Sequence, residues 1–75
     1  GPIRYWIEKH LIKSMFEQLV HNPLPFYREY LNIGIIKETL LHRERYWRFL
    51  PTLFSLYIFN LWYRKHIMRE DIVIQ

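Results

Sequence analysis

The sequence predicts an all-α fold with three main helices, at about 3–20, 32–43 and 50–68, and a short helical turn near 25–31. Apolar residues recur at helical spacing over long stretches, and prolines stand where helices would begin. The chain has 75 residues, of which 51% are hydrophobic and 19% aromatic, more apolar material than one small domain can enclose. We therefore expect a single helical unit, residues 1–75, that belongs to something larger.

The first predicted helix covers residues 3–20. Its apolar positions recur about every four residues, with further apolar residues beside them: Ile7, Leu11, Ile12, Met15, Phe16, Leu19 and Val20. Pro2 can occupy the first turn, where its missing N–H would have no helical partner. Charged pairs such as Arg4 with Glu8 contribute only about 0.2–0.5 kcal/mol each. The apolar stripe therefore determines how this helix packs.

A proline-rich break separates the first helix from the second. Pro23 and Pro25 each push the preceding residue out of the helical region, so the chain turns there. Pro25 can start the short helical turn near 25–31. Asn32 is a favourable N-cap for the second main helix, which is expected to run to about residue 43.

The last predicted helix, at about 50–68, organises the chain. Residues 49–63 carry no charge, and their apolar side chains occupy every side of a helical wheel: Leu53, Phe54, Leu56, Tyr57, Ile58, Phe59, Leu61 and Trp62. Pro51 suits its first turn, and Arg64, Lys65 and Arg69 suit the negative end of the helix dipole. We expect this helix to be enclosed on all sides in the complete protein, and residues 70–75 to form a loose tail.

Two other interpretations of the last helix are weaker. A membrane span needs roughly 18 or more apolar residues. The uncharged stretch 49–63 is shorter than this, and charged residues border it on both sides. A DNA-recognition helix is suggested by Trp62-Tyr63-Arg64-Lys65, but leucine and isoleucine crowd the faces that would meet DNA. We therefore favour a buried helix.

The sequence indicates no catalytic, cofactor-binding or metal-binding residue in this chain. It has no glycine-rich phosphate loop, no zinc motif and no cysteine. His10, His21, His42 and His66 are widely spaced and lack the spacing of metal ligands. The N-terminal stretch is amphipathic rather than continuously apolar, so no signal peptide is expected and the predicted location is cytoplasmic.

The net charge of +4 is spread along the chain, with one small basic cluster at Arg43, Arg45 and Arg48. The aromatic residues among and beside these arginines could stack on bases, as in proteins that bind single-stranded nucleic acid. Dedicated binders usually concentrate their charge more strongly on one face. We therefore keep nucleic-acid binding as a lesser alternative.

Several segments together resemble the C-terminal helical end of the synthetase domain in the asparagine synthetase (glutamine-hydrolysing) family. Pro2-Ile3-Arg4-Tyr5-Trp6-Ile7 is similar to the opening of that segment, and Leu31-Asn32 to the start of its penultimate helix. His42 is similar to the histidine that ends that helix, and Asn60-Leu61-Trp62-Tyr63-Arg64 to the end of the last helix. The positions that match the family's pattern are Pro2, Ile3, Trp6, Asn32, His42, Leu61, Trp62 and Arg64.

The resemblance implies that this chain is the C-terminal fragment of a larger α/β synthetase domain. Such a parent enzyme, with ATP and Mg²⁺, would adenylate a carboxylate such as aspartate, and ammonia from glutamine would displace AMP to form an amide. The family's pyrophosphate loop and catalytic lysine would lie upstream, so the chain would be non-catalytic by itself and would pack against the rest of the synthetase polypeptide. The alternative is a stand-alone three-helix module for protein interaction or dimerisation.

Self-association is expected of the isolated chain, because two other helices can cover only part of the last one. Some of Phe54, Tyr57, Phe59, Leu61 and Trp62 should then remain exposed. On the premise that Trp62 becomes enclosed, its replacement by alanine is expected to cost about 3–5 kcal/mol. No membrane partner is expected.

Overall fold

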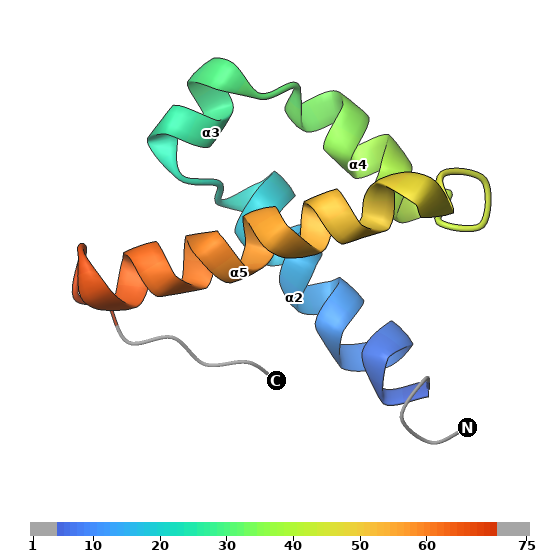
Figure 1. The fold of residues 1–75 in the computed structure, drawn as a ribbon, viewed down its shortest axis with the longest axis horizontal. Coiled ribbons are helices and arrows are strands. Elements are labelled where there is room, and N and C mark those ends of the chain that lie inside the picture. The colour runs from blue at the N-terminus through green and yellow to red at the C-terminus, as the bar shows by residue number, and fades with distance from the viewer. Residues whose placement is uncertain (1–4, 71–75) are drawn as a thin grey trace.

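The fold consists of helices joined by short turns, in a computed structural model that describes residues 5–70 apart from the side chain of Ile7 (Figure 1). In chain order the elements are η1 (Ile7–Leu11), α2 (Ile12–Phe16), η2 (Glu17–His21), α3 (Pro25–Tyr30), α4 (Ile33–Leu41), η3 (Trp47–Phe49) and α5 (Leu50–His66). The prediction of a helical chain is confirmed, and residues 5–70 contain no strand.

The first helix runs without interruption through η1, α2 and η2, close to the predicted helix at 3–20. It differs from the prediction in its geometry, because η1 and η2 are π-helical, with wider turns than an α-helix. Ile12, Met15 and Leu19 are its buried apolar residues. The start of the predicted helix, at residues 3 and 4, lies outside the described part of the chain.

The next two helices begin where the sequence predicts. Pro25 occupies the first turn of α3. Asn32 caps α4, since its Oδ1 accepts a hydrogen bond from the backbone N–H of Ile35 at 3.1 Å. Helix α4 ends at Leu41, two residues before the predicted end, and residues 42–46 form a turn that leads into η3.

Helix α5 starts at the predicted residue, with Pro51 in its first turn, and ends at His66 rather than at residue 68. The chain reverses because Arg69 adopts a left-handed conformation, with φ of 60°. The backbone N–H of Glu70 then bonds to the carbonyl oxygen of Arg64 at 2.8 Å. Of the predicted tail at 70–75, only Glu70 is described, and it is held against the helix rather than loose; the remainder lies outside the described residues.

The core lies where α5 crosses the first helix, with α3 and α4 beside the crossing (Figure 1). Its buried apolar residues come from the first helix, the turn before α3, and helices α3, α4 and α5: Ile12, Met15, Leu19, Leu24, Tyr27, Ile36, Leu40, Leu53 and Tyr57. The structure is only 17 Å thick along its shortest axis. This thickness fits two packed helices, whose axes lie about 8–10 Å apart. In such a two-layer arrangement each helix keeps an outer face.

Helix α5 therefore buries one face only, which carries Leu53, Tyr57, Asn60 and Arg64. The prediction that part of its aromatic surface stays exposed in this chain is confirmed for Phe54, Phe59 and Trp62: between 44% and 50% of each residue is accessible. The prediction required only some of the five named residues to stay exposed, and Tyr57, which is 1% exposed, is not among them. The large loss of stability expected for Trp62→Ala assumed that the Trp62 ring is enclosed. In the single chain the enclosed ring is that of Tyr57, so we expect the large loss for Tyr57→Ala instead.

None of the helices within residues 5–70 combines the length and hydropathy that a bilayer crossing requires.

Candidate docking surface

Four large apolar side chains form the outer face of α5, a name used here for Phe54, Ile58, Phe59 and Trp62. Phe54, Ile58 and Trp62 follow one another at intervals of four residues, which places them along one side of the helix. Phe59 lies one residue after Ile58 and broadens the strip. The four residues are 44% to 50% exposed. Neighbouring apolar residues that are half exposed together are typical of an interaction surface rather than of a solvent face.

The rings of this face are held from the side by an aromatic cluster. Phe26 of α3 packs its ring edge-to-face against Tyr63, with centroids 5.4 Å apart, and against Phe59 at 6.2 Å. Phe59 lies 6.0 Å from Trp62, and Trp62 lies 5.7 Å from His66. Such contacts restrict the side-chain rotamers before any partner binds, which lowers the entropy lost on docking.

Two tyrosine hydroxyls fix the opposite, buried face of α5. Tyr57 and Ser14 share a hydrogen bond of 2.7 Å between their hydroxyl oxygens, which ties α5 to the first helix. Tyr27 of α3 donates a 2.7 Å bond to the carbonyl oxygen of Leu56. Both bonds join segments far apart in the sequence, so they set which side of α5 faces outward.

A polar network crosses the core beside these tyrosines. Asn60 donates to Gln18 Oε1 at 2.8 Å, and its own Oδ1 accepts from Arg64 Nε at 3.2 Å. Arg64, 6% exposed, also donates to the carbonyl oxygen of Asn22 and lies 3.4 Å from the carboxylate of Glu70. All buried side-chain polar atoms in the described part of the chain have a hydrogen-bond partner. The network therefore fixes the crossing of α5 over the first helix.

The sequence prediction gave Arg64 only a role at the negative end of the helix dipole and missed this network. The spacing of the polar residues in α5 could have indicated part of the network. Asn60 and Arg64 are four residues apart and follow Tyr57 on one side of an otherwise apolar helix. Their partners Gln18 and Asn22 could not be found in this way, because they lie 42 residues away in the sequence.

The positions that match the family's pattern lie in separate elements and do not form one site. Trp6, 51% exposed, lies with its ring tilted against that of His10, with centroids 5.4 Å apart, at the start of the first helix. Asn32 caps α4, and the exposed His42 lies 3.4 Å from Glu38 just after that helix. On α5, Leu61 is partly buried, Trp62 belongs to the outer face and Arg64 to the polar network. Pro2 and Ile3 lie outside the described residues.

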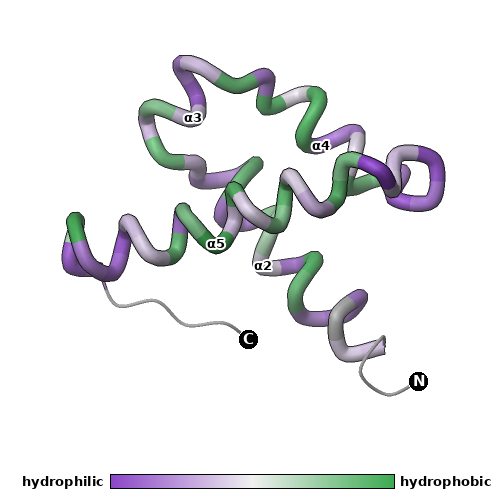
Figure 2. Tube along the Cα trace, in the orientation of Figure 1, coloured by the Kyte–Doolittle hydropathy of each residue, from purple (hydrophilic) through white to green (hydrophobic). Residues whose placement is uncertain are grey.

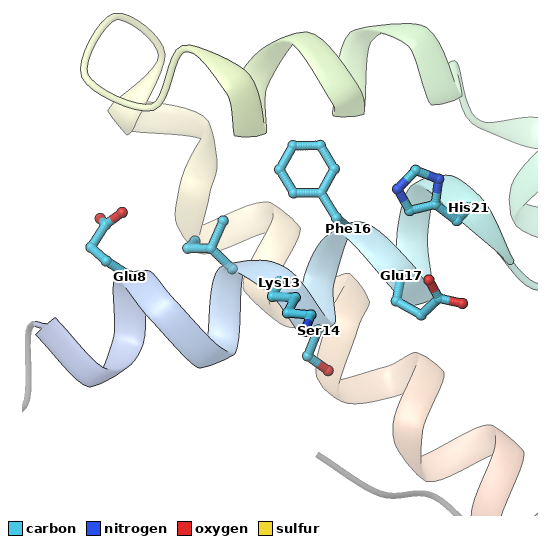
Figure 3. Close-up of a pocket in the computed structure, with 7 residues that line it drawn as sticks. Glu8, Lys13, Ser14, Phe16, Glu17 and His21 are labelled. Atoms are coloured by element: carbon cyan, nitrogen blue, oxygen red, sulfur yellow. The ribbon is translucent and has the colours of Figure 1, made fainter. Parts of the chain in front are cut away.

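A hollow of about 640 Å³ runs along the first helix, but its polar side chains do not converge on one point (Figure 3). Phe16 and His21 stack on one side of the helix, with centroids 6.2 Å apart, whereas Ser14 points to the other side. Ser14 is already bonded to Tyr57, and the Glu8 carboxylate is paired with Arg43 at 2.6 Å. Within residues 5–70 no three histidine or carboxylate side chains are arranged to hold a metal ion.

The basic connector between α4 and α5 is partly neutralised. Arg43 pairs with Glu8, whereas the Arg45 and Arg48 guanidinium groups lie over the rings of Tyr46 and Trp47, at 5.8 and 5.4 Å from the ring centroids. Trp47 is 61% exposed. This arrangement offers stacking groups but only a small local charge.

Burial raises the pKa of Tyr27 above the ordinary tyrosine value of 10.0. Folding therefore favours the protonated hydroxyl, and the unfolded chain loses its proton first as the pH rises. We expect this contribution to stability to be complete below about pH 10 and to be lost above it. Urea unfolding at increasing pH would measure the loss. Tyr27→Phe should be less stable at neutral pH but should show a flatter profile above pH ~10, and an equally steep profile would contradict the assignment.

Comparison with known proteins finds no matching family model, no similar curated protein and no similar solved structure. The interpretation of the surface therefore rests on its own residues and contacts and on the resemblance in the sequence.

Proposed function

We propose that this chain is a helical cover that docks the outer face of α5 onto a neighbouring domain. The observation that carries the proposal is the pre-arranged face of Phe54, Ile58, Phe59 and Trp62, half exposed in the folded chain. Aromatic residues at the centre of an interface commonly supply most of its binding energy. The role of the chain is structural, because its polar groups are used within the fold or are scattered over its surface.

The neighbouring domain that we propose is the synthetase domain of an asparagine-synthetase-like amidotransferase. The resemblance in Trp6, Asn32, His42 and residues 60–64 supports this assignment. In the parent enzyme, ATP would activate aspartate or a related carboxylate and ammonia from glutamine would form the amide. These steps belong to the parent, and the chain would stabilise the domain that carries them out.

Sequencing the gene upstream of Ile3 tests the identity of the parent. We expect a reading frame that continues for several hundred residues and contains a Ser-Gly-Gly-x-Asp-Ser pyrophosphate loop. A stop codon or an unrelated domain immediately upstream would contradict the synthetase assignment. It would favour the second candidate, a stand-alone interaction module, which the same exposed face supports.

Nucleic-acid binding is supported less well. The stacked Arg45–Tyr46 and Arg48–Trp47 pairs could contact a single strand. The pairing of Arg43 with Glu8 and the position of Glu44 within the same connector leave little net charge there. Most of the affinity for a polyanion comes from such charge.

Trp62→Ser is expected to weaken self-association of the isolated chain at least tenfold, because it removes the largest ring of the outer face. Trp6→Ser is a matched control. Trp6 is 51% exposed and contacts the His10 ring at a tilt, as Trp62, 50% exposed, contacts His66, but Trp6 lies on the first helix. Sedimentation velocity over a wide concentration range measures the association. Equal weakening by both variants, or a monomeric wild type throughout, would contradict the assignment of this face.

A further inference from the structure

Basic residues precede and follow the outer face of α5 along the chain. Lys65 is exposed and follows Ile58 by seven residues, which places it on the same side of the helix. Before the helix, the exposed Arg48 lies in η3. Helix α5 itself contains no aspartate or glutamate. In Figure 2, hydrophobic segments recur along α5 between paler ones, and hydrophilic colours appear in the turn before it and near its C-terminal end.

From this charge pattern we propose that the surface covered by α5 is apolar at its centre and carries carboxylates opposite Arg48 and Lys65. This inference rests on the proposed docking function and adds the chemistry of the partner. Docking would bring the two cations close to a protein surface, where an opposite charge compensates for the water they lose. A neutral apolar surface would leave both cations without compensation.

The same pattern argues against a second copy of this chain as the natural partner. With a rise of 1.5 Å per residue, Lys65 lies roughly 10 Å and Arg48 roughly 15 Å from Ile58 along the axis. In an antiparallel pair centred on Ile58, Lys65 of one copy would approach Arg48 of the other within about one helical turn. In a parallel pair each cation would meet its own equivalent. Both arrangements place like charges within a Debye length of about 10 Å.

The two modes of association should therefore respond to salt in opposite ways. Self-association of the isolated chain, driven by the apolar centre, should strengthen as salt screens the basic ends. Binding to an acidic-ended surface should weaken as salt screens the attraction.

Two synthetic helical peptides of about 18 residues, which reach past both ends of the outer face, serve as probes. They share one leucine-rich stripe and differ only at their ends, which carry glutamate in one peptide and glutamine in the other. We expect the glutamate peptide to bind the folded chain at least tenfold more tightly in low salt, as measured by fluorescence anisotropy of the labelled peptide. That preference should fall severalfold in high salt.

Charge-reversal variants test whether Arg48 and Lys65 recognise the glutamate peptide or whether the net charge of +4 merely attracts it. Arg48→Glu with Lys65→Glu should abolish the preference for the glutamate peptide. The control, Lys13→Glu with Lys37→Glu, removes the same charge from exposed positions on the first helix and α4 and should retain most of the preference. Circular dichroism would verify that both variants fold.

Equal binding of the two peptides, or an equal loss in both double variants, would overturn the proposal. So would a dimer that is tightest in low salt, since its basic ends would then attract rather than repel. These outcomes concern the partner surface alone. An unrelated domain upstream would refute the synthetase assignment without changing the peptide result, so the two failures can be told apart.

Discussion

Replacing Tyr57 with alanine is expected to destabilise the folded chain by about 3–5 kcal/mol, the range for removing a large buried aromatic side chain. Tyr57 is 1% exposed where α5 crosses the first helix, and its hydroxyl is bonded to Ser14. The substitution removes the ring, leaves a cavity and frees the Ser14 hydroxyl from its partner. A single domain of this length is marginally stable, so a loss of this size would unfold most of the population.

Phe54→Ala is the matched control for Tyr57→Ala. Phe54 lies three residues earlier in α5 and is 44% exposed, so its truncation should cost roughly 1 kcal/mol or less. Urea unfolding followed by circular dichroism compares the two variants, at low protein concentration so that self-association does not contribute. Similar losses for both would mean that α5 does not face the core with its Tyr57 side.

Arg64→Ala is expected to cost about 3 kcal/mol, because it removes the central donor of a buried network. Arg64 donates to Asn60 and to the Asn22 carbonyl oxygen and lies beside Glu70. Without the guanidinium, the Asn60 and Asn22 oxygens lose a donor inside the fold, and a large side-chain volume is lost. The carboxylate of Glu70 is partly exposed and can return to water, so its own contribution is smaller.

Two control variants, Lys65→Ala and Arg64→Met, show which property of Arg64 stabilises the fold. Lys65 is the exposed neighbour, and its truncation should change stability by no more than about 0.5 kcal/mol. Arg64→Met keeps much of the side-chain volume without the hydrogen bonds, and should recover only part of the loss. Full recovery by methionine, in thermal unfolding, would show that packing rather than the polar network matters at this position.

The sequence alone was sufficient for the local features of this protein. Pro25, Asn32 and Pro51 act on their own backbone neighbours, so the starts of α3, α4 and α5 could be predicted from proline and capping chemistry. The apolar stripe of the first helix was also visible, since its polar side is clearly defined. The same reasoning predicted that aromatic surface on α5 would remain uncovered, because the chain is too short to enclose it.

Only the tertiary structure decided which side of α5 faces the core. A helix that is apolar on every side has no periodicity from which its orientation can be read, so Tyr57 and Trp62 were equivalent in the sequence. Their difference comes from partners distant in the chain: Ser14 for Tyr57, and Gln18 and Asn22 for the polar network beside it. Contacts between residues some forty positions apart depend on how whole helices cross, which no local pattern records. The outer face of α5, and with it the candidate docking surface, follows from that crossing.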